Sequence, residues 1–503
     1  MDIDQYRSKV SATFNAAPSA KTVDIAVIGG GVQGCALAAE AASRRLSTLL
    51  IEAEDIANGA SSRSNRIIGG DLSQLEQLDI EAVNRGLQEQ AILRQRAPHL
   101  VRSHNFTILP NTTLRSRRRI QAGLYSYRAL QRRFGLPSNS CPAHIIDVPY
   151  SELFSYCDDS VDDSRLTLAL AQQARTLGAS IRPHTKLLKA TRKQDFWLLE
   201  LQNSNGNIEH LRAKVLINAA GSASVKLMQD HIEHSSRSKG MLRRDDYLVI
   251  SSPAHCDNAL VLQADNKQLI YLLDTPSGQH AVLGPWQSNN AEAMDPSAAE
   301  EQLIALYNQN FKANISADDI VHRFHALRCL CADSSCEQNK TSQDYALDLD
   351  NPASLAPLLN SYGGNIGTHR LLAEQALTIL QPFTGALINP ELKTKSLPGG
   401  DFNGGLTALQ SELEFNNPTI EPTLLQRLAR SYGSNSHKIL LGVTRMTDLG
   451  LRFGDNLYQR EVEYLCSEEW AQSAEDILWR RSKLGLCFSA AEKQALQAFI
   501  SAG

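Results

Sequence analysis

The stretch DIAVIGGGVQG, residues 24–34, decides the fold class of this chain. Residues 24–28 form a compact apolar run rich in β-branched side chains, which predicts a buried strand. The glycines end that strand, and the alanine-rich stretch 35–43 predicts a helix after them. A second apolar strand is expected over residues 47–51. This order of strand, turn, helix and strand implies a parallel sheet, and therefore an α/β fold.

The glycines of this turn have the spacing Gly-x-Gly-x-x-Gly, at Gly29, Gly31 and Gly34. The first permits the tight turn, the second lets the backbone approach a pyrophosphate, and the third lets the helix pack on the strand. The N-terminus of that helix offers N–H groups and positive partial charge to phosphates. Glu52 follows the second strand, where a carboxylate that binds a ribose hydroxyl belongs, and it disfavours NADP. The unit predicts a dinucleotide site and leaves FAD and NAD open.

Two further features favour FAD. The sequence Asn-Ala-Ala-Gly at 218–221 follows an apolar run at 214–218 that predicts a buried strand. The pair Gly363-Gly364 precedes a helix that is expected to begin near Thr368. A helix N-terminus at that place favours negative charge on a reduced flavin ring. Either feature taken alone is also compatible with a structural turn.

Composition restricts the class of protein further. The chain has 503 residues, which predicts two or three domains. Its 42% hydrophobic and 21% charged residues are ordinary for a folded enzyme, and its net charge of -4 gives no general attraction to nucleic acid. We expect no transmembrane helix, because no apolar run reaches about 18 residues, and no secretory signal in the polar N-terminus. The nine cysteines lack a Cys-x-x-Cys pair, which favours reduced thiols over a metal site.

The rest of the chain divides into a strand-rich middle and a helical end. Apolar runs at 247–250, 260–263 and 269–273, with turn signals between them, predict an antiparallel sheet separate from the nucleotide domain. A helix is expected over 422–432, followed by Gly433, and Ser489-Ala-Ala-Glu492 is a capping-box signature before a last helix.

Taken together, these residues resemble the FAD-dependent glycerol-3-phosphate dehydrogenase family from about Thr22 to the C-terminus. The segments that carry the resemblance are 24–34, 51–53, 61–62, 157–166, 319–321, 326–330, 363–364, 371–374, 432–435, 448–450 and 474–485. Trp479-Arg480-Arg481 in its helical context is distinctive, because amine and amino-acid oxidases share the nucleotide fold but not this helical end.

The resemblance implies an α/β architecture with a Rossmann-like FAD-binding domain, an antiparallel-sheet substrate domain and a C-terminal helical cap domain. An N-terminal arm is expected at 1–21, followed by an oxidoreductase region at 22–385, a linker at 386–405 and the helical domain at 406–503. Within the oxidoreductase region, the expected FAD-binding segments are about 22–90, 150–230 and 350–385. The expected substrate-domain segments between them are about 91–149 and 231–349.

The family oxidises sn-glycerol 3-phosphate to dihydroxyacetone phosphate and passes the electrons through FAD to membrane quinone. Carried over by position, the residues expected to contact FAD are Gly29, Gly31, Gly34, Glu52, Ser61, Ser62, Gly364 and Thr368. Arg328 matches the active-site arginine of the family. A guanidinium beside the flavin can pair with a substrate phosphate or with developing alkoxide charge.

The departures from the family concentrate at the expected substrate site. The family reads His-Gly-Gly-Leu-Arg-Tyr where this chain has residues 69–74, Gly-Gly-Asp-Leu-Ser-Gln. The family lysine that follows the Gly-Gly pair is Asn365 here. Residues 284–287, Gly-Pro-Trp-Gln, replace a Gly-Thr-Thr-Asp turn, and 244–247, Arg-Asp-Asp-Tyr, replace Lys-Gly-Ser-His. The loss of an arginine and a lysine would weaken phosphate binding by about 3–6 kcal/mol unless other residues replace them.

Several residues are candidates to fill these roles. Arg66 and Arg370 keep a basic residue where the family often has one, and are the expected substrate-binding residues, with Arg243 and Arg244 as further possible replacements. His369 and Tyr247 are, with Arg328, the candidate catalytic residues, for proton transfer.

The stretch 114–133 is strongly basic, with aromatic and leucine side chains between its arginines. This pattern suits an anionic lipid surface, although a solvated helix face is the alternative. Together with the resemblance, it predicts a cytoplasmic protein, peripheral on the inner face of the membrane, that reaches a quinone acceptor and forms a homodimer.

Three functions are open from the sequence. The first is glycerol-3-phosphate dehydrogenase activity, supported by Arg328 and the intact nucleotide motif. The second is a divergent FAD-dependent relative that oxidises another hydroxy compound. The third is a non-catalytic flavin-binding protein at the membrane surface.

Overall fold

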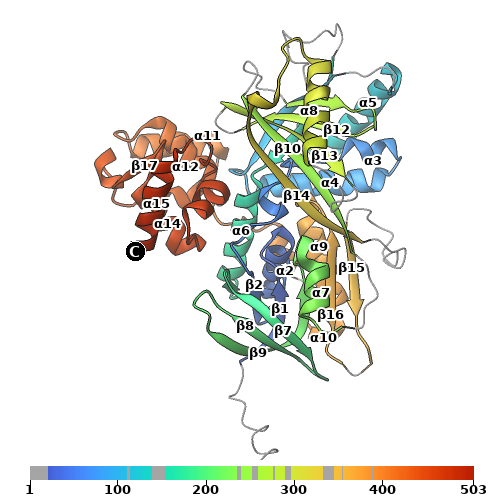
Figure 1. Ribbon diagram of the computed structural model, residues 1–503, viewed down its shortest axis with the longest axis vertical. Helices are drawn as coiled ribbons and strands as arrows, with labels where there is room; N and C mark the ends of the chain where they lie inside the picture. Colours follow the sequence, from blue (N-terminus) through green and yellow to red (C-terminus); the bar gives the residue numbers. More distant parts are fainter. Residues whose placement is uncertain are drawn as a thin grey trace, which may run out of the picture.

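The computed structural model describes residues 21–109, 114–138, 153–234, 240–251, 259–275, 278–288, 296–331, 345–353, 355–387 and 389–502. Nearly all of the expected N-terminal arm lies outside these ranges. Within them the chain forms two large sheets and a separate group of helices (Figure 1). This arrangement confirms the predicted fold class.

The first sheet carries the glycine-rich turn, and its central path runs in the order β15-β16-β9-β1-β2-β6. Its strands are β1 (Thr22–Ile28), β2 (Thr48–Ile51), β6 (Ser180–Arg182), β7 (Lys186–Arg192), β8 (Trp197–Gln202), β9 (Ile208–Asn218), β15 (Tyr345–Asp350) and β16 (Leu358–Gly363). Strand β1 pairs in parallel with β2 and β9, and β9 pairs in parallel with β16. The carboxyl ends of β1 and β9 therefore lie side by side, as a nucleotide site requires.

Alternate side chains of β1 enter two different cores, because successive residues of a strand point to opposite faces. Ile25 and Val27 pack under the helices α2 (Val32–Ser43), α6 (Asp163–Thr176) and α9 (His369–Ile379). Ala26 and Ile28 face the core formed with the β7–β8 hairpin. Burial on both faces fixes the register of β1 and the place where its glycine turn begins.

The second sheet has the order β14-β10-β13-β12-β11-β4-β5-β3. Its strands are β3 (Ile67–Ile68), β4 (Val101–Ile108), β5 (Phe154–Val161), β10 (Gly240–Ser251), β11 (Ala259–Gln263), β12 (Leu269–Asp274), β13 (His280–Ser288) and β14 (Ile320–Cys331). The pairing is antiparallel as predicted, except between β11 and β4, which are parallel. The helices packed with this sheet are α3 (Leu72–Glu76), α4 (Ile80–Arg96), α5 (Arg117–Arg133) and α8 (Pro296–Asn310).

The C-terminal residues form a helical domain with its own core, beside α6 (Figure 1). Its elements include α11 (Gly405–Asn416), α12 (Pro422–Tyr432), α13 (Ser436–Ile439), α14 (Gln459–Glu469), α15 (Ala490–Ala502) and the small hairpin β17 (Arg452–Gly454) and β18 (Leu457–Tyr458). The predicted helix 422–432 is confirmed. The capping box before α15 is confirmed too, since Ser489 and Glu492 exchange hydrogen bonds.

The segment boundaries differ in part from those expected. Strands β3 and β5 fall in segments assigned to the FAD-binding domain, yet they hydrogen-bond into the second sheet. Strand β15 falls mostly in a substrate-domain segment, yet it pairs with β16 of the first sheet. The expected linker 386–405 is packed in its second half. There Leu397 is buried and its N–H donates to the carbonyl of Arg96.

Candidate active site

The glycine-rich turn has the close approaches that its spacing predicts. Gly29 has a φ of +114°, and a Cβ there would lie 2.4 Å from the carbonyl oxygen of Ala219 at the end of β9. A Cβ on Gly34 would overlap the carbonyl oxygen of Gly29. Helix α2 begins after Gly31, which provides no side-chain cap, and its first turn holds no acidic residue. This N-terminus suits a pyrophosphate, which would accept from its N–H groups.

Glu52 and Ser61 support this turn. The Glu52 carboxylate accepts from the N–H of Gly30 at 2.6 Å and from the N–H of Glu54 at 2.9 Å. Burial raises the pKa of the Glu52 carboxyl. Two backbone donors leave further acceptor positions on the carboxylate for a ribose hydroxyl. Ser61 Oγ accepts from the N–H of Val32 at 2.9 Å, so Ser61 lies at the N-terminus of α2, and Ser62 follows it in the same short turn.

The pair Gly363-Gly364 connects the two sheets. Both glycines have positive φ, +71° and +80°. Gln33 of α2 donates to the carbonyl of Gly363, and a Cβ on Gly364 would meet the Gln33 side chain. Arg328 on β14 donates from Nη2 to the carbonyl of Gly364 at 2.7 Å. Arg328 is therefore placed beside the turn that precedes α9.

The short 3-10 turn η5 (Ile366–Thr368), which leads into α9, is capped by Asn365. Its side-chain oxygen accepts from the N–H of Gly367 at 2.8 Å and from the N–H of Thr368 at 3.1 Å. Thr368 thus stays at the start of the helix, as the sequence predicts. The residue that replaces the family lysine has taken a capping role.

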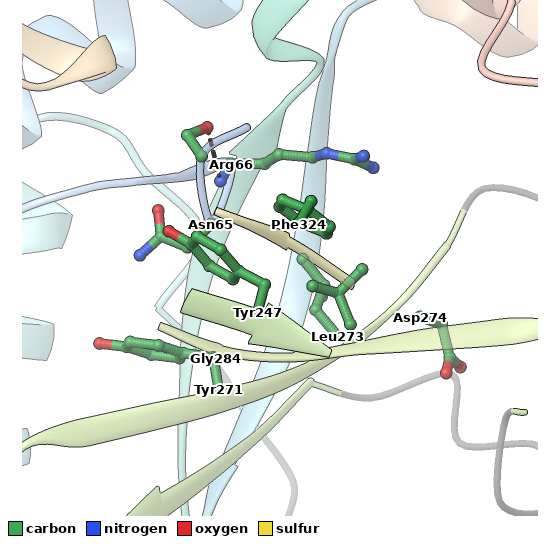
Figure 2. Close-up of a pocket in the computed structure, with 10 residues that line it drawn as sticks. Asn65, Arg66, Tyr247, Tyr271, Leu273, Asp274, Gly284 and Phe324 are labelled. Carbon is green, nitrogen blue, oxygen red and sulfur yellow. Dashed lines mark hydrogen bonds between the residues drawn. The ribbon is translucent and has the colours of Figure 1, made fainter. Parts of the chain in front are cut away.

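A narrow pocket lies against the second sheet (Figure 2). The residues that line it are Ser64, Asn65, Arg66, Tyr247, Tyr271, Leu273, Asp274, Val282, Gly284 and Phe324. Two of the predicted site residues, Arg66 and Tyr247, are brought together here from chain positions far apart. Figure 2 shows the Tyr247 ring beside Asn65 and the Arg66 side chain extending above Phe324.

Arg66 is the basic residue in this lining. Its backbone has a φ of +62° and its N–H donates to Ser64 Oγ at 3.0 Å. Its guanidinium Nε is 4.0 Å from Asp163, which is too far for a hydrogen bond. The other suggested replacements are engaged more closely, since Arg243 pairs with Asp245 at 3.2 Å and Arg244 with Asp246 at 2.8 Å.

Tyr247 is held rigidly as a protonated phenol. It is buried and stacks on Phe324, with ring centroids 4.8 Å apart and planes at 11°. Burial, and then the charge of Asp245, raise the pKa of Tyr247 above its ordinary value. The phenol therefore suits donation of a hydrogen bond better than removal of a proton.

The structure does not bring His369 to this pocket. The side chain is 3% exposed, and its Nδ1–H donates to the carbonyl of Ile366 at 2.7 Å. Burial lowers the pKa of His369 to about 4, so the imidazole is neutral. The prediction of a proton-transfer role for His369 is corrected accordingly, because the α9 N-terminus turns its side chain into the protein interior.

Arg370 is also engaged within the protein. Its guanidinium donates to Glu89 of α4 at 2.7 and 2.8 Å and pairs with Glu374 one turn along α9. These two carboxylates compensate its charge, so the structure corrects the prediction that Arg370 binds the substrate. Its basic character ties α9 to α4 instead.

A group of possible metal ligands is also neutralised. Carboxylate or imidazole atoms of Asp55, His184 and Asp476 lie within 4.8 Å of one another. However, Asp55 pairs with both Arg480 and Arg481, and Asp476 pairs with Arg480. Guanidinium groups therefore take the place that a cation would need. Among the described cysteines, Cys331 is disulfide-bonded, against the expectation of reduced thiols, and the other five are free.

Comparisons with known proteins identify the family. The model described as FAD dependent oxidoreductase matches residues 24–341, and the model for the C-terminal domain of alpha-glycerophosphate oxidase matches 393–502. A glycerol-3-phosphate dehydrogenase of Pseudomonas aeruginosa is 36% identical over 493 residues, covering 96% of each chain. The chain belongs to the FAD-dependent glycerol-3-phosphate dehydrogenase family. It is therefore an FAD-dependent oxidoreductase, and its cofactor is FAD.

The chain is also similar to a second dehydrogenase and to a solved structure. A D-erythritol 1-phosphate dehydrogenase of Brucella abortus is 31% identical over 489 residues, covering 94% of this chain and 97% of that protein. The solved glycerol-3-phosphate dehydrogenase of Bacillus halodurans, complexed with FAD, superposes with a TM-score of 0.70. It is 19% identical and covers 99% of this chain and 96% of its own. This likeness agrees with the fold of both sheets and the helical domain.

Gly69 stands where the family has histidine, and its surroundings include a contact that the sequence did not indicate. A Cβ on Gly69 would lie 2.2 Å from the Asp158 carboxylate. Asp158 is buried, accepts from Tyr127 and Gln90, and has its pKa raised by burial. The space next to residue 69 is thus filled by an acidic group. Asp158 lies inside a segment that carries the resemblance, but its long-range contact with Gly69 leaves no sequence signal.

Proposed function

We propose that this chain oxidises sn-glycerol 3-phosphate to dihydroxyacetone phosphate and passes the electrons through FAD to membrane quinone. The observation that carries the proposal is the pocket in which Arg66 and Tyr247 meet, together with Arg328 at the Gly364 turn. Relatives named glycerol-3-phosphate dehydrogenase match nearly the whole chain, and they support the same activity.

The residues of the chain suit complementary tasks in this reaction. FAD, when bound, supplies the two-electron acceptor. Arg66 provides a cation that pairs with the substrate phosphate, and Arg328 provides a guanidinium that stabilises negative charge on the substrate hydroxyl oxygen. Tyr247 donates a hydrogen bond from its protonated phenol and orients the substrate. The stacked Phe324 supports the Tyr247 ring.

Anaerobic mixing of the purified FAD-loaded protein with glycerol 3-phosphate tests this proposal. Loss of the flavin absorbance at millimolar substrate is the expected result, and dithionite reduction provides the reference for complete loss. A protein that dithionite reduces, but that glycerol 3-phosphate leaves oxidised, would contradict the proposal.

A second candidate function is the oxidation of another hydroxy compound. Asp158 fills the space beside Gly69, and Asn365 caps the short turn before α9 in place of a lysine, so two family positions no longer offer their usual groups. The similarity to a relative named D-erythritol 1-phosphate dehydrogenase supports a longer phosphorylated polyol as the substrate of this chain. Reduction rates with glycerol 3-phosphate, erythritol phosphates and glycerol, measured side by side, separate the two functions. No reduction with any polyol would favour a non-catalytic role.

We also propose that α5 binds the anionic inner face of the cytoplasmic membrane, where the protein acts as a peripheral homodimer on the cytoplasmic side. Ile120, Leu124 and Tyr127 face the core, whereas Tyr125 is 78% exposed. The arginines 117–119, 132 and 133 are exposed around it. Helices α3 and α4 contact α5, and Leu78 in the turn between them and Ile80 at the start of α4 are exposed. Apolar tips among arginines suit an anionic lipid surface.

This attachment is peripheral in the proposal because none of the described helices is both long and apolar enough to cross a bilayer. Co-sedimentation with vesicles that contain phosphatidylglycerol tests the lipid contact, and sedimentation equilibrium tests the dimer. Equal binding to neutral and anionic vesicles would contradict the electrostatic part.

A further inference from the structure

The C-terminal helical domain contacts β14, the strand that contributes Phe324 to the pocket lining, through Trp479. This residue lies in the π-helical turn η9 (Asp476–Arg481) and stacks on His322 of β14, with ring centroids 4.7 Å apart and planes at 21°. His322 stacks on Phe324 two residues along the strand, and Phe324 stacks on Tyr247. A continuous row of rings therefore leads from the C-terminal domain to the pocket.

Trp479 is itself held in one orientation. A Cβ on Gly485 would lie 2.6 Å from the indole, so only a glycine fits beneath the ring. The ammonium group of Lys493 lies 5.9 Å from the centroid of the same ring. Burial lowers the pKa of His322, so the imidazole that meets the indole is neutral at physiological pH. The indole is a fixed support and not a loosely packed surface group.

A second connection runs through Lys483 to the opposite wall. Its ammonium group pairs with Asp163 and, at 3.1 Å, with Asp162. Asp163 accepts from the N–H and from the hydroxyl of Ser64, both at 3.0 Å. Ser64 Oγ in turn accepts from the N–H of Arg66. Asp163 has no exposed surface, so its carboxylate needs these donors and the Lys483 charge.

We propose that Trp479 and Lys483 are positioning residues for the substrate pocket. Trp479 supports the Tyr247 and Phe324 wall, and Lys483 fixes the loop that carries Arg66 in its left-handed conformation. The C-terminal domain thereby sets the distance between the phosphate-binding cation and the hydroxyl-binding phenol. This inference rests on the proposed function and extends it, because it makes selectivity for a phosphorylated polyol depend on a domain outside the pocket.

The first test replaces Trp479 in the full-length holoenzyme. Trp479→Leu removes the ring stack, and the dissociation constant of glycerol 3-phosphate in anaerobic flavin reduction is expected to rise about tenfold, with FAD content unchanged. Trp479→Phe keeps a ring and is expected to restore most of the affinity. The matched control is Trp470→Leu, because Trp470 lies in the same domain and stacks under Arg175 of α6, away from the pocket.

The second test replaces Lys483. Lys483→Met is expected to raise the same dissociation constant, and Lys483→Arg to preserve it, since the cation opposite Asp163 is kept. Glu468→Gln is the control, because it removes an ion pair between the same domain and Arg175 without a connection to Ser64. If the control variants weaken substrate binding as much as their partners, or if Trp479→Leu and Lys483→Met leave it unchanged, the inference is wrong.

Hydrogen exchange keeps this inference separable from the proposed function. Trp479→Leu is expected to speed amide exchange in 243–250, and Lys483→Met in 64–68, with the controls unchanged. This readout needs no substrate. If the wild-type protein ignores glycerol 3-phosphate but the two variants show these exchange changes, the proposed function alone is refuted. Unchanged exchange in both variants refutes the positioning role.

Discussion

The carbonyl oxygen of Gly364 accepts a 2.7 Å hydrogen bond from Nη2 of Arg328. This contact joins β14 of the second sheet to the turn that precedes α9 on the first sheet. Both glycines of the turn have positive φ, a conformation in which glycine is permissive. Hydrogen bonds such as the one from Arg328 therefore fix the direction of the carbonyl group. The arginine therefore has a structural task as well as the chemical one proposed for it.

Arg328→Ala should lower the rate of flavin reduction by glycerol 3-phosphate. The variant loses a charge-assisted bond of about 1.5–3 kcal/mol, which corresponds to about 10- to 150-fold in kcat/KM. Stopped-flow absorbance measures the effect. Arg328→Lys keeps the charge without the planar fork and should fall between the wild type and alanine. Wild-type kinetics in the alanine variant would show that Arg328 has no part in the reaction.

Arg66→Ala should weaken substrate binding with a smaller effect on the limiting rate. Its guanidinium comes no closer than 4.0 Å to Asp163 and forms no hydrogen bond with it, so its charge remains available to a phosphate. The loss of that pairing costs about 1.5–3 kcal/mol of binding, seen as a higher dissociation constant in anaerobic titration. Arg323→Ala is the control, because Arg323 on β14 is exposed and pairs with Glu300. Equal losses in both variants would indicate a general effect of charge.

Charge reversal on α5 should release the protein from anionic vesicles. Arg118→Glu with Arg119→Glu removes two exposed cations, at about 1 kcal/mol each near the lipid surface, and should weaken binding at least about thirtyfold. Lys393→Glu with Lys395→Glu makes the same change of net charge on another exposed segment. Vesicle co-sedimentation compares them, and similar losses in both pairs would argue against a lipid-binding role for α5.

The sequence predicts the nucleotide site well because that site is encoded by local spacing. Gly29, Gly31 and Gly34 lie within one turn, and close backbone contacts leave no room for a side chain at Gly29 and Gly34. Glu52 follows from the length of one strand–helix–strand unit. The same holds for the α12 helix and for the α15 capping box, whose partners are a few residues apart.

The substrate site is less predictable because its partners are far apart in the chain. Arg370 and Glu89 are 281 positions apart, so nothing near Arg370 indicates that its charge is already compensated. His369 is the first residue of a helix, and only the packing of α9 decides that its imidazole points inward. The contact between Gly69 and Asp158 likewise depends on how β3 pairs with β5.

Acid should destabilise this protein through its buried histidines. Burial lowers the pKa of His99 to about 3 and that of His369 to about 4, from 6.5. Between the ordinary pKa of 6.5 and the lowered pKa of each histidine, the folded state binds fewer protons than the unfolded state. The stability that these neutral histidines contribute is therefore fully present above about pH 6.5 and is lost as the pH falls. Each histidine then costs about 2 kcal/mol at about pH 5. The melting temperature should therefore drop between about pH 7.5 and about pH 5.

His99→Gln should reduce this drop, because it removes one of the two groups. His210→Gln serves as the control, since His210 is exposed on β9. Differential scanning calorimetry at both pH values provides the comparison. An unchanged difference in melting temperature in His99→Gln would show that His99 does not contribute to the acid sensitivity.

Asn365→Lys should improve the use of glycerol 3-phosphate. It restores the family lysine at an exposed position beside the Gly363-Gly364 turn, and one charge-assisted bond to phosphate corresponds to about a tenfold gain in affinity or more. The cost is the cap that Asn365 gives to the N–H groups of Gly367 and Thr368, about 1 kcal/mol of stability. Asn365→Ala loses the same cap without adding a cation, so it should be equally destabilised with no gain in affinity. Anaerobic titration and thermal melting of both variants separate charge from capping. If lysine and alanine behave alike, the substrate phosphate does not approach the N-terminus of α9, and the pocket has been reshaped for a different hydroxy compound.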